Sequence, residues 1–408
     1  MRQCGRCFSL AVCFQFIVLA AASLEELESR ASALKAAGNA AGALAAYQEA
    51  AGLDPKSARY QDEIGFLLRV LNRSPEALEH FHQAITLDPQ FAPAHFHLGV
   101  ALFLEQNTAA AISELQSAAN LDAENATYQS KLGQALELSG QHQEAIPHLK
   151  TAVRLQPADG LAWINLGSAL EKTGDAAAAL DADTRAIEIA PASADARNNL
   201  GLILVKMRRP DEGIAEFQRV LEADPSNNNA RFNIGFAHLL KAELDQAIPA
   251  FRDVIARDPK HAAAHYNLGV ALKNKDDIDG AQAEFSRALQ IDPKMAEAHY
   301  MIGITSWQSG EFDRAATEMR AAIALRGDYG DAYFMLGTVL KQKGESAPAE
   351  DALRTAIRLD PANPGPYNTL ALLLRQKGDI DGSKRLFAEG ARAKQAKENE
   401  LGVMLGRQ

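Results

Sequence analysis

The chain has 408 residues, 47% of them hydrophobic but only 6% aromatic, and a formal net charge of −10. Phosphate binding needs a net basic face, so this acidic composition argues against a nucleic-acid partner. The low aromatic content, together with abundant alanine, favours a core built from closely packed local layers.

The N-terminal residues have the composition of an export signal. Arg2 and Arg6 precede an apolar run over residues 8–22, which ends in three alanines at 20–22. This pattern is typical of a segment that signal peptidase removes, so we expect residues 1–22 to be cleaved. The run has about 15 residues, fewer than the roughly 20 that span a bilayer, which makes an uncleaved membrane anchor the weaker alternative. We therefore expect a periplasmic or extracellular protein without a stable membrane span.

All three cysteines, Cys4, Cys7 and Cys13, lie in that segment, so the mature chain would contain no disulfide. Cleavage would also remove two arginines and no acidic residue, which moves the net charge from −10 to −12. The sequence leaves open which exported compartment holds the protein.

From residue 24 the chain repeats with a period of 34 residues. A proline stands at position 32 of eight segments, from Pro55 to Pro361, and Ala123 and Gly327 fill this position in two others without an insertion. A fixed period of this length indicates a repeat architecture. The eleven segments are 24–57, 58–91, 92–125, 126–159, 160–193, 194–227, 228–261, 262–295, 296–329, 330–363 and 364–397.

Each segment has the pattern of two helices. In segment 160–193, apolar residues at positions 4, 7 and 11 (Trp163, Leu166 and Leu170) share one face of a first helix, which ends near Gly174. A second apolar run ends at Pro191, because proline cannot continue a helix interior. Position 8 is glycine in nine segments, and such small residues let two helices touch closely.

These positions resemble the tetratricopeptide repeat. The match covers about residues 24–397 and rests on Trp163, Leu166, Gly167, Leu170, Ala179, Ala186 and Pro191 with their counterparts in the other segments. The resemblance implies an all-α fold, in which antiparallel helix pairs stack into a right-handed superhelix and the first helix of each pair lines a concave groove. We expect one solenoid with a short tail at residues 398–408.

No room remains for a catalytic domain, because only residues 1–23 and 398–408 lie outside the repeats. The sequence lacks a Gly-rich phosphate loop, a Gly-x-Ser-x-Gly elbow and a His-Glu-x-x-His motif. We therefore expect neither an enzyme nor a cofactor.

The histidines do not have the spacing of a metal site. His80 and His82 are two residues apart, as are His95 and His97, and residues with this spacing on a helix point in opposed directions. Position 4 holds histidine in three repeats, where Trp163 stands in another, and we expect these side chains to pack in the core. The three are His95, His265 and His299.

One polar residue recurs on the face that should line the groove. At 100° per residue, positions 2, 5, 6, 9, 12 and 13 of each first helix lie opposite the apolar face and are expected to point outward. Asparagine occupies position 6 in four consecutive repeats, as Asn165, Asn199, Asn233 and Asn267. Since an amide donates and accepts at once, these residues could hold the backbone of an extended peptide. The alternative is that they only stabilise local structure.

This arrangement resembles the asparagine ladder in the superhelical repeats of the O-linked N-acetylglucosamine transferases, which implies binding of extended peptides. Aromatic residues on the same face are expected to be exposed and to contact the partner, or else to pack on the next repeat. They are Phe232, Phe236, Tyr266, Tyr300, Trp307 and Phe334, after Phe96 earlier in the chain.

Two further expectations concern charged residues. Asp183 occupies position 24, which is usually apolar, and we expect it to form a salt bridge with Arg197 of the following repeat. The carboxylate clamp of chaperone-binding family members needs Lys at position 5 and Asn at position 9, and no repeat has either.

The preferred interpretation is an exported, non-enzymatic scaffold that binds an extended segment of a protein or peptide partner. The alternative is an assembly subunit of a secretion, pilus or envelope-polysaccharide machinery that acts through its convex face or its ends. The sequence leaves the partner's identity and the oligomeric state open.

Overall fold

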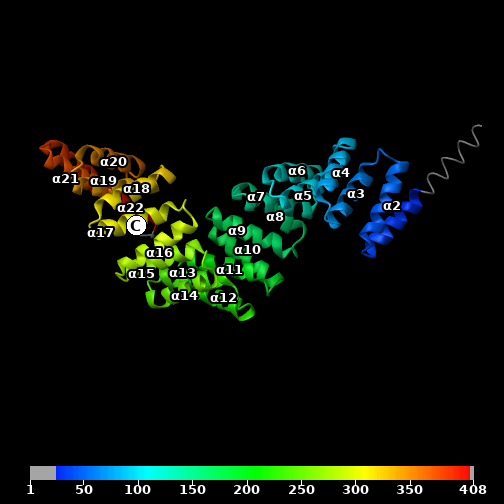
Figure 1. Cartoon of the computed structure of the whole chain (residues 1–408), viewed down its shortest axis with the longest axis horizontal. Helices are drawn as coiled ribbons and strands as arrows, with labels where there is room; N and C mark the ends of the chain where they lie inside the picture. The colour runs from blue at the N-terminus through cyan, green and yellow to red at the C-terminus, as the bar shows by residue number, and fades with distance from the viewer. Residues whose placement is uncertain (1–23, 405–408) are drawn as a thin grey trace, which may run out of the picture. The chain divides into compact units, whose positions relative to one another are not determined.

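The computed structural model describes residues 24–404, and the side chains of residues 24–399. The predicted export signal, residues 1–22, lies outside the described residues. Over the described part the chain is a succession of helical hairpins, as predicted (Figure 1). No helix within residues 24–404 is long and apolar enough to cross a bilayer.

The first helix of each hairpin starts at or next to position 1 of its repeat. These helices are residues 24–36, α3 (Ala58–Val70), α5 (Ala92–Leu104), α7 (Ala126–Leu138), α9 (Gly160–Lys172), α11 (Ala194–Lys206), α13 (Asn228–Leu240), α15 (Ala262–Asn274), α17 (Ala296–Gln308), α19 (Gly330–Gln342) and α21 (Pro364–Gln376).

The second helices have 14 residues each except the last. They are α2 (Ala40–Leu53), α4 (Ser74–Leu87), α6 (Thr108–Leu121), α8 (His142–Leu155), α10 (Ala176–Ile189), α12 (Pro210–Ala223), α14 (Leu244–Arg257), α16 (Ile278–Ile291), α18 (Phe312–Leu325), α20 (Ser346–Leu359) and α22 (Ile380–Met404). Helix α22 has 25 residues and continues into the segment predicted as a tail, as far as Met404.

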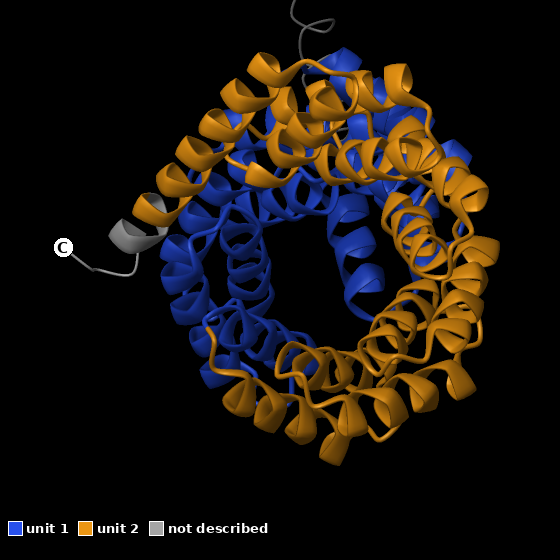
Figure 2. Ribbon diagram, turned by 90° about the vertical axis from the view of Figure 1, so that its left-hand side faces the viewer, with its two compact units in different colours: residues 1–207 blue, residues 208–408 orange. Residues whose placement is uncertain are grey.

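The chain divides into two compact units, residues 1–207 and 208–408, which Figure 2 shows in different colours. The division falls in the turn between α11 and α12, the two helices of the sixth repeat. Within each unit, successive hairpins pack side by side in chain order and follow a curved path (Figure 2).

The glycine at position 8 lies where the two helices of a hairpin touch, as predicted. A Cβ atom added to Gly133 would lie 2.5 Å from Cγ of Leu149, at position 24 of the same repeat. The corresponding distance from Gly269 to a ring carbon of Phe285 is 2.7 Å. A side chain added at Gly133 or Gly269 would therefore force the facing Leu149 or Phe285 to move.

The turn inside every hairpin contains one residue in the left-handed conformation, always at position 15. Six repeats have glycine there, including Gly140 at φ 82°, and five have other residues, including Arg208 at 61° and Ala242 at 57°. This conformation is unfavourable for a residue with a Cβ atom. The five repeats therefore retain strain that glycine would remove.

Position 4 has a polar role in addition to its packing role. Trp163 Nε1 donates to the carbonyl oxygen of Pro157 at 3.0 Å, and His95 Nε2 lies 3.1 Å from the Pro89 oxygen. These carbonyls follow the end of the preceding helix, where no intrahelical donor is available. In these repeats the side chain at position 4 thus links the proline to the helix that follows it.

Arg197 has the same role, which explains why the predicted salt bridge with Asp183 is absent. Arg197 Nε and Nη2 donate to the Pro191 carbonyl oxygen at 3.2 and 3.0 Å. Asp183 is fully buried against Gly167 inside its own hairpin, and neither carboxylate oxygen has a hydrogen-bond partner of ordinary geometry. The prediction was therefore wrong.

Candidate functional site

The candidate site is the face formed by positions 2, 5, 6, 9, 12 and 13 of the first helices, here called the groove face. In the first unit its predicted asparagines are Asn165 on α9 and Asn199 on α11, two helices in contact. In the second unit they are Asn233 on α13 and Asn267 on α15, which also touch each other. Each unit thus presents one pair of asparagines on consecutive repeats.

The asparagines are less exposed than predicted. Asn165 and Asn233 are only 8% exposed, and Asn199 and Asn267 are half-buried. Position 6 was expected to point outward, but none of the four side chains is fully exposed.

The four asparagines differ in the hydrogen bonds that their side chains make. Nδ2 of Asn165 is buried and has no hydrogen-bond partner within the described residues. Nδ2 of Asn267 instead donates to the Ala263 carbonyl oxygen of its own helix at 2.8 Å. The Asn199 amide lies near Asp183 and lowers the pKa of that carboxyl, although burial, the larger effect, raises it to about 8. Asn165 therefore has an unused donor, whereas Asn267 has a local structural role.

The predicted aromatic residues are all half-buried, so the expectation that they are exposed was wrong. Three of the six pack against residues around the start of the following first helix. The ring of Phe232 stacks on His261 at 5.1 Å between centroids, and Tyr300 lies 5.1 Å from Tyr329. A Cβ atom added to Gly365 would lie 2.9 Å from Phe334.

Trp307, Tyr266 and Phe236 differ in their polar contacts. Nε1 of Trp307 donates to Oε1 of Gln342 at 2.6 Å, which links α17 to α19. Burial raises the pKa of Tyr266 and of Tyr300 to about 12, so both hydroxyls stay protonated at neutral pH. Phe236 is half-buried one helical turn after Phe232.

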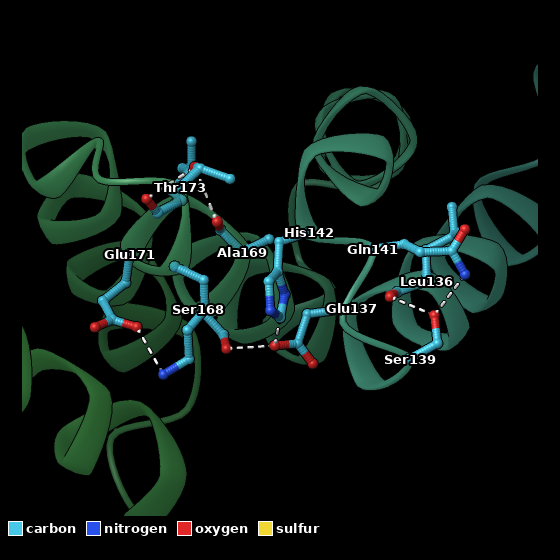
Figure 3. Close-up of polar contacts among 11 residues, drawn as sticks. Leu136, Glu137, Ser139, Gln141, His142, Ser168, Ala169, Glu171 and Thr173 are labelled. Carbon is cyan, nitrogen blue, oxygen red and sulfur yellow. Dashed lines mark hydrogen bonds and ion pairs between the residues drawn. The ribbon is translucent and has the colours of Figure 1, made fainter. Parts of the chain in front are cut away.

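Carboxylates occupy position 12 of the groove face on α7 and α9. Oγ of Ser168 donates to Oε1 of Glu137 at 2.6 Å, and His142 Nδ1 lies 3.8 Å from the same oxygen (Figure 3). Glu171 is paired with Lys206 and, at 3.1 Å, with Lys172. Glu171 is therefore paired with lysines, whereas Glu137 accepts a hydrogen bond from a serine hydroxyl.

The sequence analysis missed an aliphatic row at position 13. Val70, Leu104 and Leu138 end three consecutive first helices and are 55%, 61% and 62% exposed. The same 34-residue spacing that revealed the asparagines would have revealed this row. The row ends at α9, where position 13 is Lys172.

The histidines pair with carboxylates. Nδ1 of His95 lies 2.6 Å from Glu114, and His265 and His299 contact Glu284 and Glu318 at 2.6 and 2.7 Å. His95 and His265 are buried, which confirms the packing role of these two residues. Within residues 24–399, no group of three or more His, Cys, Asp and Glu side chains could hold a metal ion.

Comparisons with known proteins agree with this architecture. Two family models, both described as tetratricopeptide repeat, match the chain, one over residues 130–194, 198–245 and 300–364 and the other over 72–135 and 238–303. No curated protein sequence matches the chain significantly.

Several solved structures are similar. Yeast Tom70 is 17% identical and the match covers 94% of each chain, with a TM-score of 0.50. Human IFIT1 is 15% identical over 89% of this chain and 88% of that chain, with a TM-score of 0.52. A tetratricopeptide repeat protein of Parabacteroides merdae is 15% identical over 61% of this chain and 98% of that chain, with a TM-score of 0.53. At these identities the likeness shows the fold alone.

The 34-residue period, the hairpins with their glycine contacts and the two family models lead to the same conclusion. The chain belongs to the tetratricopeptide repeat family.

Proposed function

We propose that this protein is an exported, non-enzymatic scaffold that binds an extended segment of a partner protein through the groove face. Repeat solenoids offer long surfaces of recurring groups, and tetratricopeptide repeat proteins are typically scaffolds. In each unit one pair of asparagines would contact backbone groups of the partner. Repeat layers are about 10 Å apart and an extended chain advances about 3.3 Å per residue. The two asparagines of a pair would therefore contact partner residues about three positions apart.

The observation that supports this proposal most is the unused donor of Asn165. A buried amide without a partner lowers stability by roughly 1–3 kcal/mol, so a purely structural role does not explain it. A peptide carbonyl reaching this position would satisfy the donor after a small rotation of the side chain. The half-buried Phe232, Phe236, Tyr266, Tyr300, Trp307 and Phe334 would supply apolar contact to side chains of the same partner.

The structure offers an internal comparison that separates binding from folding. Replacing Asn165 by Ala removes an unsatisfied group, so stability should stay constant or rise while peptide binding weakens. Replacing Asn267 by Ala removes its hydrogen bond to Ala263, so stability should fall by about 1 kcal/mol.

The test begins with a displayed library of random peptides, selected on the immobilised wild-type protein. Retained peptides are then measured by isothermal titration calorimetry against two double variants, Asn165→Ala with Asn199→Ala, and Asn233→Ala with Asn267→Ala. At least tenfold weaker binding by either variant, with unchanged circular dichroism, supports the proposal. Unchanged binding by both variants contradicts it.

The alternative of an assembly subunit is favoured by a second exposed row. Leu53, Leu87 and Leu121, at position 30 of consecutive repeats, are 52%, 39% and 41% exposed at the ends of second helices. The triple variant with serine at these positions is the matched control. If it loses the partner and the asparagine variants keep it, the assembly function replaces the groove proposal.

Export is a separate part of the proposal and has its own measurement. Mass spectrometry of the intact protein, recovered from the cells that make it, should show a chain that begins near residue 23. A chain that retains residues 1–22 would favour the membrane-anchored alternative.

A further inference from the structure

Two neighbouring cavities lie on the groove face of the first unit, two repeats before Asn165. The first has a volume of about 300 Å³ and is lined by Phe66, Val70, Phe96 and Val100, among others. The second has a volume of about 290 Å³ and is lined by Val100, Phe103, Leu104 and Leu115, among others. Val100 and Lys131 belong to both linings, so the two cavities adjoin each other on α3, α5 and α7.

The walls of the first cavity are held in place without a ligand. His97 Nδ1 lies 2.8 Å from Oδ1 of the buried Asp62, which fixes the imidazole ring. Around that ring, the centroids of Phe66 and Phe96 lie at 5.4 and 5.6 Å. A site whose side chains are already ordered loses less conformational entropy on binding.

Both cavities open beside exposed aliphatic groups. Val70 and Leu104 line the first and second cavity and are 55% and 61% exposed. Val70 and Leu104 occupy position 13 of consecutive repeats, so the two cavities follow the 34-residue period. Recurrent exposed aliphatics next to cavities favour the binding of apolar side chains.

The charges around these cavities are basic, although the whole chain has a net charge of −10. Arg69 lines the first cavity and Lys131 lines both, and neither lining includes a carboxylate. Two acidic groups on α3 are already paired, Asp62 with His97 and Glu63 with Lys35 at 2.6 Å. Within the described residues, no carboxylate lies within ion-pair distance of Arg69 or Lys131. A binding segment that carries acidic residues would therefore complement this part of the groove face.

We propose that this pair of cavities binds an acidic, extended segment of a partner protein by taking up two large aliphatic side chains of that segment, three residues apart, with its carboxylates near Arg69 and Lys131. The spacing follows from the repeat. Layers about 10 Å apart match the roughly 9.3 Å advance of three residues in a polyproline-II chain, in which residues i and i+3 share one side. This site involves none of the four asparagines, so the inference does not depend on whether they bind a peptide.

The test uses fluorescein-labelled peptides of defined sequence and measures their binding to the full chain by fluorescence anisotropy. The main probe carries two leucines at i and i+3, separated by two prolines and flanked on each side by two aspartates. A second peptide places the leucines at i and i+2, and a third replaces all aspartates by lysine. We expect the first peptide to bind at least tenfold more tightly than either of the others, and its affinity to fall with added salt.

Two variants locate the site. Leu104→Asp should weaken the first peptide at least tenfold, because a carboxylate would occupy the mouth of the second cavity. Lys131→Glu should weaken the first peptide and strengthen the lysine peptide. The matched control is Leu240→Asp, which changes a 59% exposed leucine at the same repeat position in the second unit and should leave binding unchanged.

Three outcomes would overturn the inference: equal binding of acidic and basic peptides, no loss with Leu104→Asp, or an equal loss with Leu240→Asp. Size-exclusion chromatography of the wild type and of Leu104→Asp tests whether a second copy of the chain occupies the cavities instead. If the wild type is a dimer that this variant dissociates, the cavities hold a second copy of the chain and the inference is wrong. The asparagine variants should bind the first peptide normally, which keeps this result separate from the test of the proposed function.

Discussion

Asp183 should make the first unit less stable as the pH rises. Nine other repeats place Phe, Leu or Met at position 24, including Leu149, which packs on Gly133. Asp183 packs on Gly167 in the same way, but it puts a carboxyl where those repeats have an apolar group. We predict that Asp183→Leu, which recreates the Gly133 and Leu149 pair, stabilises the unit and removes most of its pH dependence above pH 4.

The magnitude follows from the pKa shift. Burial, offset only in part by the Asn199 amide, raises the pKa of Asp183 from 3.8 to about 8. Because the folded state binds this proton more tightly than the unfolded state, stability is highest below pH 4 and falls as the pH rises through 8. The loss is about 1.4 kcal/mol per pH unit over that interval, of the order of 5 kcal/mol in all, before any entry of water around the carboxylate reduces it.

The assay is urea-induced unfolding from pH 5 to pH 9, followed by circular dichroism, with hydrogen exchange of the α10 amides as a local measure. The variant's gain in unfolding free energy should be several kcal/mol larger at pH 8 than at pH 5. Asp181→Asn, at an exposed position of the same helix, is the control and should leave the pH profile unchanged. A gain that does not vary with pH, or a loss of stability at pH 8, would refute the reasoning.

Two other changes test the fold. Ala242→Gly should stabilise the second unit by about 1 kcal/mol in urea unfolding, because position 15 is left-handed there. Gly140→Ala should destabilise the first unit by a similar amount. Changes of the opposite sign would contradict the strain argument. Phe285→Ala should lower the unfolding free energy by about 3–5 kcal/mol, since this fully buried ring fills the space beside Gly269; a loss below 1 kcal/mol would show that the site collapses freely.

The architecture could be predicted because each repeat contains the same local information. Position 8 and position 24 belong to one hairpin, so the contact of Gly133 with Leu149 follows from short-range spacing alone. The polar role of position 4 was not predicted, although side chains with a donor recur there with the same period as the prolines. The hydrogen bond from position 4 to the proline carbonyl can be recognised only when the geometry of the turn between the two helices is known.

The exposure of the groove face could not be predicted from a helical wheel. The wheel treats each first helix as isolated, whereas consecutive first helices touch, and Asn165 and Asn233 are each only 8% exposed. The expected pairing of Asp183 with Arg197 of the next repeat failed as well, because Arg197 reaches the Pro191 carbonyl instead. Side-chain contacts between repeats depend on the angle at which consecutive repeats stack, and the sequence of a single repeat does not determine this angle.

The central claim is that position-6 asparagines bind a peptide backbone. The most direct measurement is calorimetric titration of one selected peptide, and of its analogue with ester links at every third backbone amide, into the wild type and into the variant with alanine at 165, 199, 233 and 267. We predict that the wild type binds the peptide at least tenfold more tightly than the ester analogue, and that the variant loses this preference. Equal preference in the two proteins would contradict the claim.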